Sequence, residues 1–196
     1  MKSLLFVLVL LSVSIKTNAQ GKTTDYKLSL EADLLPYSLG GYFGALAFGD
    51  DNMRIRAIGA SATKPDIILP SGFTKNTLQA YALLLDYFPY SKNYSGFWGY
   101  TGVVYWSSTI QNKDDNSKSA FTNTLLSVGG GYSYYFFKDL YVSPWAGLHV
   151  RVAGDKSVPV GTKTFEVPLL NPEASVKIGW CFTLFTKNSS TDPLSH

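Results

Sequence analysis

The sequence predicts an all-β fold, an eight-stranded antiparallel transmembrane β-barrel. Apolar and polar residues alternate with a period of two in eight successive segments, and the connections between these segments vary regularly in length. Beyond residue 19 the longest unbroken apolar run is Ala80 to Leu85, which is too short for a membrane helix. Only helices and closed sheets satisfy every backbone hydrogen-bonding group inside lipid, so a chain of this kind that spans a membrane must form a barrel.

The N-terminal residues carry the pattern of a secretory signal peptide. Lys2 precedes an apolar run from Leu4 to Val13, and small residues stand at the positions that signal peptidase reads. A membrane anchor would need about 20 apolar residues, whereas this run stops before Lys16. We therefore expect residues 1–19 to be cleaved after Ala19 and the mature protein to be exported.

The charge, the cysteine content and the spacing of possible metal ligands argue against nucleic-acid binding, disulfide bonds and a metal site. The chain has 17 Lys and Arg against 14 Asp and Glu, and loss of Lys2 and Lys16 with the signal peptide lowers the basic count to 15 (17 − 2). With so little excess positive charge, nucleic acid is not an expected partner. Cys181 is the only cysteine, so no internal disulfide is expected. His, Cys, Asp and Glu do not cluster at metal-site spacing, and we expect no metal and no cofactor.

The first predicted strand shows the period of two most clearly. From Tyr26 to Leu34, apolar residues alternate with Lys27, Ser29, Glu31 and Asp33. A helix would scatter these apolar positions around its circumference, so a strand fits better. Seven segments of the same kind follow. The eight predicted strands cover residues 26–34, 41–48, 53–62, 76–88, 97–110, 121–137, 141–153 and 168–184.

The strand at 76–88 is the weakest of these predictions. Residues 78–85 are good helix formers and alternate only in part, so the segment could include a short helix at the barrel rim.

The connections also indicate a barrel. Transmembrane barrels with both termini on one side have short turns on that side and longer loops on the other. The first connection of the longer-loop side, around 36–40, is short and fits less well. The expected longer loops are 64–75, 111–120 and 154–167, the tight turns are 49–52 and 138–140, and 89–96 is intermediate.

The last two predicted strands show which residues share a face. Leu148 and Val150 alternate with His149 and Arg151, and the final strand alternates in the same way. In a soluble barrel the apolar face points inward around a ligand, whereas in a membrane barrel it contacts lipid. The period alone leaves both orientations open. The signal peptide, the aromatic residues at strand ends and the small residues on the opposite face favour the membrane orientation.

Nine charged side chains are expected on the inner face. Glu31 and Asp33 are two carboxylates on one strand face, an arrangement that could serve acid and base chemistry. The interior of an eight-stranded barrel is just wide enough to be filled by side chains, so charges inside it must be paired. We therefore expect a salt-bridge network rather than a catalytic site, with Glu31 coupled to Arg151. The expected members are Lys27, Glu31, Asp33, Arg54, Arg56, Asp86, Arg151, Glu173 and Lys177.

The run from Pro172 to Phe182 resembles the closing strand of small bacterial outer-membrane β-barrel proteins, a broad OmpA/OmpX-like group. Residues 129–132 and 137–145 also fit this group, and the resemblance extends over residues 26–184. It implies an eight-stranded barrel in the outer membrane of a Gram-negative bacterium.

The resemblance also implies an assembly signal. In the group, the last strand alternates aromatic and apolar residues, ends in Phe and is read by the barrel assembly machinery. Ile178, Trp180 and Phe182 match this pattern. In most members the Phe is the last residue, whereas here Thr183 to His196 follow, so the signal is internal or shifted toward Phe185.

His149 is the candidate for catalysis. Lipid A deacylases of the outer membrane are barrels of this size that use a His and a Ser on one strand face. The residues two positions from His149 are Gly147 and Arg151 rather than Ser, although Ser143 or Ser175 could approach from elsewhere. Because a nucleophile and its base must lie within hydrogen-bond reach, we predict no catalytic residue.

These observations predict a barrel domain at 20–185 followed by a polar tail at 186–196. We expect a monomer without enzyme activity, in contact with outer-membrane lipid and lipopolysaccharide, that acts in envelope integrity or in surface interactions through its outer loops. Two alternatives stay open: a lipid-modifying enzyme similar to the lipid A deacylases, and a narrow pore for small solutes.

Overall fold

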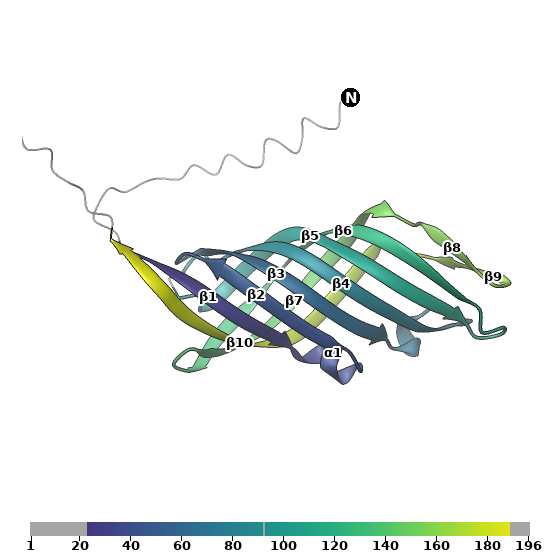
Figure 1. The fold of residues 1–196 in the computed structure, drawn as a ribbon, viewed down its shortest axis with the longest axis horizontal. Helices are drawn as coiled ribbons and strands as arrows, with labels where there is room; N and C mark the ends of the chain where they lie inside the picture. The colour runs from purple at the N-terminus through teal and green to yellow at the C-terminus, as the bar shows by residue number, and fades with distance from the viewer. Residues whose placement is uncertain (1–22, 92, 189–196) are drawn as a thin grey trace, which may run out of the picture.

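The chain forms a closed ring of eight antiparallel strands, as the sequence predicts. The structure, a computed structural model, describes residues 23–91 and 93–188. The strand order around the ring is β1-β10-β7-β6-β5-β4-β3-β2, so the last strand pairs with the first (Figure 1). The strands of the ring are β1 (Thr23–Asp33), β2 (Tyr42–Gly49), β3 (Met53–Lys64), β4 (Phe73–Tyr87), β5 (Gly96–Asn112), β6 (Lys118–Phe137), β7 (Leu140–Gly154) and β10 (Leu170–Asn188).

The remaining elements lie in the connections. A short helix, α1 (Leu34–Ser38), joins β1 to β2, and a 3-10 turn, η2 (Asp66–Ile68), precedes β4. Strands β8 (Ser157–Val160) and β9 (Lys163–Glu166) form a separate two-stranded sheet between β7 and β10. In the part of the chain that the structure describes, no helix is long and apolar enough to cross a membrane.

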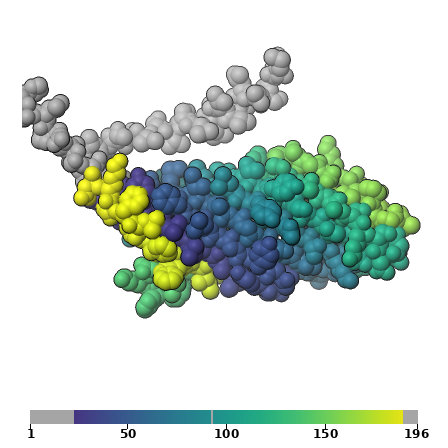
Figure 2. All heavy atoms as spheres, in the orientation of Figure 1, coloured from purple at the N-terminus to yellow at the C-terminus, as the bar shows by residue number. Residues whose placement is uncertain are grey.

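Strands β1 and β10 close the ring. Leu30 lies opposite Trp180 and Leu28 opposite Phe182, and the register shifts between Tyr26 and Lys27. In the space-filling view, the atoms of β10 (yellow) lie directly against those of β1 (purple) (Figure 2). Because both edges of every strand in the ring are paired, the sheet has no open edge in the described residues.

Most strand boundaries differ from the sequence prediction by a few residues, and three differences from that prediction have consequences for the fold. The first strand stops at Asp33, because the Asp33 carboxylate accepts a hydrogen bond from the Leu35 backbone N–H at 3.1 Å and caps α1. The rim helix considered within 76–88 is wrong: β4 pairs with β3 without a register shift from Asn76 to Tyr87, and this pairing overrides the local helix propensity. Strand β10 continues through Asn188, three residues into the expected tail.

A fourth difference concerns the loop expected at 154–167, which contains the β8–β9 hairpin. Val158 pairs with Phe165, both side chains are buried, and Gly161 turns the chain at a φ of 60°. The expected signal peptide and its cleavage site lie outside the described residues, as do residues 189–196.

The two faces of the strands point as the membrane orientation predicts. On β10, Lys177 is 1% exposed, whereas Ile178 and Trp180 are 41% and 53% exposed. The same alternation holds on β1, where Glu31 is buried and Leu30 is exposed. The apolar face therefore covers the outside of the barrel, and the charged face lines the inside.

Inward glycines make room for inward tyrosines. A Cβ atom at Gly147 would lie 1.9 Å from the Tyr100 hydroxyl oxygen, and one at Gly179 would lie 2.2 Å from the Tyr141 ring. Contacts this short do not occur, so any larger residue at either glycine would displace a tyrosine. The glycines on these strands are therefore packing positions, and the tyrosines fill the space that they leave.

We predict that Val128→Arg, at an outward position in the middle of β6, destabilises the barrel by about 2–4 kcal/mol, because a cation there would face hydrocarbon. The measurement is the urea midpoint of the protein folded into phospholipid vesicles, with Val128→Leu as the control. An unchanged midpoint for Val128→Arg would show that this face contacts water.

A second prediction concerns the assembly signal at the closing strand. Phe182→Asp should leave the protein soluble in the periplasm, while Phe182→Tyr and a chain ending at Asn188 should still reach the outer membrane, because the paired part of β10 is retained. Cell fractionation and the migration of unheated samples on gels report the outcome. Normal assembly of Phe182→Asp would place the signal elsewhere.

Candidate functional site

Five charged side chains meet across the lumen and form an ion-pair layer. Arg54 donates to Glu31 Oε1 at 2.6 Å and to Asp86 Oδ2 at 2.8 Å. Arg56 contacts the second oxygens of the same carboxylates, at 3.2 Å and 2.9 Å. Lys177 Nζ lies 3.0 Å from Glu31 Oε2. The layer joins β1, β3, β4 and β10, which come from opposite ends of the chain.

Aromatic rings pack against the cations of this layer. The Arg54 guanidinium lies 5.2 Å from the centroid of the Phe88 ring, and Lys177 Nζ lies 4.3 Å from that of Trp98. Tyr141 donates from its hydroxyl to Glu31 and accepts from Arg54 at 3.1 Å. Removing charges from water costs several kcal/mol per ion, and these contacts with the ion pairs offset that cost.

Four of the nine expected network residues lie outside the layer. Lys27 pairs with Asp51 at 3.2 Å near the β2–β3 turn. Asp33 accepts hydrogen bonds from Trp145 Nε1 at 2.7 Å and from the Ser175 hydroxyl. Arg151 contacts the backbone of Asp155, and Glu173 contacts His149. Sequence reasoning missed Asp51, Trp145 and Tyr141, because none belongs to a pattern of charges along one strand.

The expected coupling between Glu31 and Arg151 is wrong. Arg151 donates to the backbone carbonyl of Asp155, beyond the end of β7. Glu31 lies opposite Gly179 of β10, and Gly179 lies opposite Tyr141 of β7. The β7 side chain that reaches Glu31 is therefore Tyr141, ten residues away from Arg151 along the strand.

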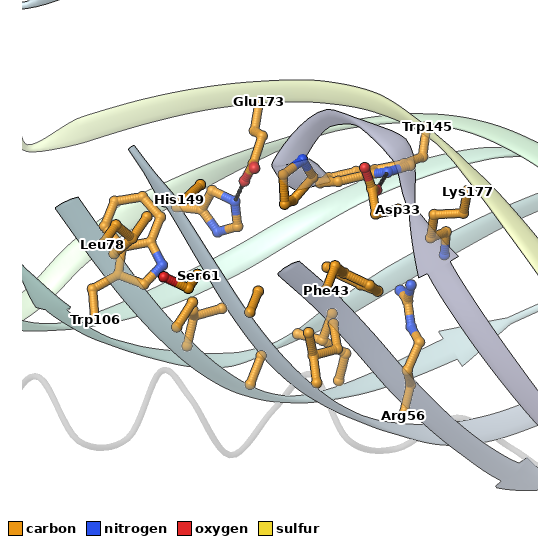
Figure 3. A pocket seen from close by; sticks show the side chains of 18 of the residues that line it. Asp33, Phe43, Arg56, Ser61, Leu78, Trp106, Trp145, His149, Glu173 and Lys177 are labelled. Carbon is orange, nitrogen blue, oxygen red and sulfur yellow. Dashed lines mark hydrogen bonds and ion pairs between the residues drawn. The ribbon is translucent and has the colours of Figure 1, made fainter. Parts of the chain in front are cut away.

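On the α1 side of the layer the lumen contains a cavity of about 90 Å³, called here the inner chamber. Its floor carries Arg56 and Lys177, and its far end carries Leu78 and Trp106 (Figure 3). The walls between them are mostly apolar. They include Phe43, Ile58, Ala80, Ala82, Leu84 and Val104.

The inner chamber continues into a second cavity of about 530 Å³, called here the vestibule. The two share Ala62, Leu78, Trp106, His149 and Glu173 in their linings. The vestibule extends to residues of the β3–β4 and β7–β10 connections, so the chamber opens at the end of the barrel that carries the longer loops.

The opposite end of the barrel has a polar cavity of about 420 Å³, lined by residues that include Lys27, Asn93, Tyr135 and Lys138. It shares no lining residue with the inner chamber or the vestibule. The ion-pair layer and a buried cluster around Phe88, Tyr94, Trp98, Tyr100 and Tyr141 lie between the two ends.

His149 sits on the wall that the inner chamber and the vestibule share. Its Nε2 atom lies 2.8 Å from Glu173 Oε2, and its buried Nδ1 atom has no hydrogen-bond partner among the described residues. The two serines considered from the sequence are engaged elsewhere: Ser143 with Trp98, and Ser175 with Asp33.

Ser127 is a serine near His149 that sequence reasoning missed. It lies directly opposite His149 in the β6–β7 pairing, and its hydroxyl oxygen is buried without a hydrogen-bond partner. No hydrogen bond joins the two side chains, and Ser127 lines neither cavity. In the described residues, His149 therefore has no nucleophile in reach. The same part of the chain contains no group of three His, Cys, Asp or Glu that could hold a metal ion.

The longer loops are joined to one another. Lys113 pairs with Asp66 at 3.2 Å, and Lys163 pairs with Asp114 at 2.6 Å. The Asp115 carboxylate accepts from the backbone N–H groups of Ser117 and Thr162, and these hydrogen bonds hold the pKa of Asp115 below its usual value. The β3–β4, β5–β6 and β8–β9 segments thus form one connected surface around the vestibule.

No family model and no curated protein matches the chain. Among solved structures, the chain is similar to the N-terminal β-barrel domain of Pseudomonas aeruginosa OprF, with 12% identity and a TM-score of 0.51 over 83% of this chain and 100% of that one. It is also similar to Neisserial surface protein A (NspA), with 17% identity and a TM-score of 0.44 over 81% and 95%. The OprF similarity shows the fold, that of small eight-stranded outer-membrane barrels, and confirms at this level the resemblance seen in the sequence.

We predict that Glu31→Gln destabilises the barrel by about 3–5 kcal/mol, because it leaves Arg54, Arg56 and Lys177 with Asp86 as their remaining carboxylate in the layer. Lys177→Met should cost less, because Glu31 keeps both arginines. The double variant should lose much less than the sum. Urea midpoints in phospholipid vesicles measure all three.

Arg151→Gln is the control for this cycle, since Arg151 lies outside the layer. It should cost little and should add to Glu31→Gln without coupling. Additive losses for Glu31 and Lys177 would contradict the ion-pair layer.

Proposed function

We propose that this chain is a non-enzymatic outer-membrane barrel protein with a closed lumen, acting in envelope integrity or surface interactions through its outer loops. The observation that carries the proposal is the ion-pair layer. Its charged side chains are all at most 5% exposed, and they connect β1, β3, β4 and β10 across the lumen. An ion that passed through the barrel would have to separate these pairs.

The absence of enzyme activity in this proposal is supported by the surroundings of His149. Its one polar partner in the described residues is Glu173, and acyl transfer needs a nucleophile within hydrogen-bond reach of the base. The lipid A deacylase alternative would require Ser127 and His149 to approach each other and Ser127 to open onto the chamber.

The proposed location and partners follow from the outer face of the barrel. Its exposed apolar side chains are suited to outer-membrane lipid and lipopolysaccharide. We place the longer loops outside the cell and the β2–β3 and β6–β7 turns in the periplasm. The proposal includes export through a signal peptide cleaved after Ala19, insertion by the barrel assembly machinery through Ile178, Trp180 and Phe182, and a monomeric state.

Conductance in planar lipid bilayers tests the closed lumen. The unmodified protein should show no steady ion current. The double variant Glu31→Ala, Arg54→Ala should show resolvable current steps, because it removes the two central members of the layer. Val128→Leu, on the outside, is the control and should stay silent. Steady current through the unmodified protein would favour the narrow pore.

A separate assay tests the proposed absence of enzyme activity. Vesicles that contain lipid A should release no acyl chains in the presence of the protein. Release that His149→Ala or Ser127→Ala abolishes, without any change in unheated gel migration, would favour the lipid-modifying enzyme.

A further inference from the structure

The walls of the inner chamber above the ion-pair layer are mostly apolar, although the interior of a membrane barrel is ordinarily polar. Inward positions there are occupied by Ile58, Leu78, Leu84, Val104 and Trp106. Nothing in the strand pairing requires apolar residues at these positions, because their side chains face away from lipid. Water alone would be a poor occupant of a cavity with apolar walls.

Small residues on the same walls leave the chamber open. Ala60, Ala62, Ala80 and Ala82 all line it, on adjacent strands β3 and β4. Below the layer, the Phe88 and Tyr94 rings are buried and pack against each other in the lumen. The two halves of one barrel thus differ in packing, and the open half is the one that connects to the vestibule.

The size of the chamber restricts what can enter it. Its volume of about 90 Å³ is below the cavity of about 150 Å³ that accommodates benzene in another protein. The vestibule of about 530 Å³ is within the range of small-molecule sites. A fused ring system would not reach the layer, whereas the end of a single hydrocarbon chain fits.

The charges that line the two cavities favour an anionic head group. Arg56 and Lys177 are held by the ion-pair layer, and the Glu173 carboxylate is held by His149. Lys64 Nζ lies at the vestibule, 3.5 Å from Asn171 Oδ1 and 4.7 Å from the centroid of the Trp106 ring. Glu173 is its electrostatic neighbour there, but in the described residues no carboxylate lies within ion-pair distance of Lys64.

Two further polar side chains of the vestibule are incompletely satisfied. Asn76 is 3% exposed and its Oδ1 atom is buried without a partner, as is the Nδ1 atom of His149. Buried polar atoms without partners are uncommon, and these two belong to side chains that line the vestibule, where a polar group could reach them.

From these observations we propose that the inner chamber and vestibule bind a slender amphiphile with one apolar chain and a carboxylate head, such as a medium-chain fatty acid. The chain end lies between Leu78 and Ala82 above the ion-pair layer, and the head lies beside Lys64. This inference rests on the proposed function for the orientation of the vestibule toward the outside. Conductance and ligand binding are separate measurements, so either can fail without the other.

The test uses the full chain in lipid nanodiscs and 12-bromododecanoate, whose bromine quenches tryptophan fluorescence on contact. Trp180 faces outward and would be quenched by probe dissolved in the bilayer, so it is replaced by Phe throughout. Quenching should saturate and should be reversed by dodecanoate. Ala82→Phe, which fills the chamber, should weaken binding at least about tenfold, equivalent to about 1.4 kcal/mol.

Matched controls separate the chamber from general effects. Leu83→Phe adds a ring at the neighbouring outward position and should bind within about twofold of the parent. Lys64→Gln should weaken competition by dodecanoate about tenfold and leave that by dodecanol unchanged. If Ala82→Phe fails to fold, as judged by unheated gel migration, Ala80→Leu takes its place.

The outcomes are decisive in either direction. Quenching that rises linearly with probe, resists dodecanoate, or is equal in Ala82→Phe and its parent would overturn the chamber as the binding site. Equal competition by dodecanoate before and after Lys64→Gln would overturn the assignment of the carboxylate to Lys64.

Discussion

The barrel is held together across its lumen by charged side chains, each of which would be costly to bury without a partner of opposite charge. Glu31 and Asp86 each accept from both arginines, and Glu31 also accepts from Lys177. Because every charge in the layer has an opposite charge in contact, the ion pairs offset part of the cost of burying them. The same contacts hold β1, β3, β4 and β10 at one relative position, including the junction where the ring closes.

The ion-pair layer also divides the lumen into two parts with different packing. At the level of the layer, Tyr100 and Tyr141 fill space that Gly147 and Gly179 leave open, and on the turn side Phe88 packs against Tyr94. On the loop side, alanines stand where larger residues would fit, and a chamber remains. A side-chain-filled half and a half with an open chamber therefore coexist in one barrel, because the size of inward residues changes along the strands while the strand pairing stays the same.

The loop end carries its own small core. Val158, Val160 and Phe165 of the β8–β9 hairpin are buried against Ile110 and Phe121 at the ends of β5 and β6. The Lys113–Asp66 and Lys163–Asp114 pairs are at least one-third exposed on both partners and contribute little to stability. The apolar contacts therefore hold this surface in position, and the exposed ion pairs add little to its stability.

The sequence by itself determined the number of ring strands, their antiparallel order and the face that each residue occupies. A period of two is a property of one strand alone. The sequence therefore predicts that Lys177 points inward and Ile178 outward without reference to any neighbouring strand. Which inward residues meet was decided by the tertiary structure. Register between strands distant in sequence places Tyr141, not Arg151, beside Glu31, and brings Ser127 opposite His149. The chamber likewise exists only once the alanines of β3 and β4 face the same lumen, because a cavity belongs to the space between strands and to no single strand.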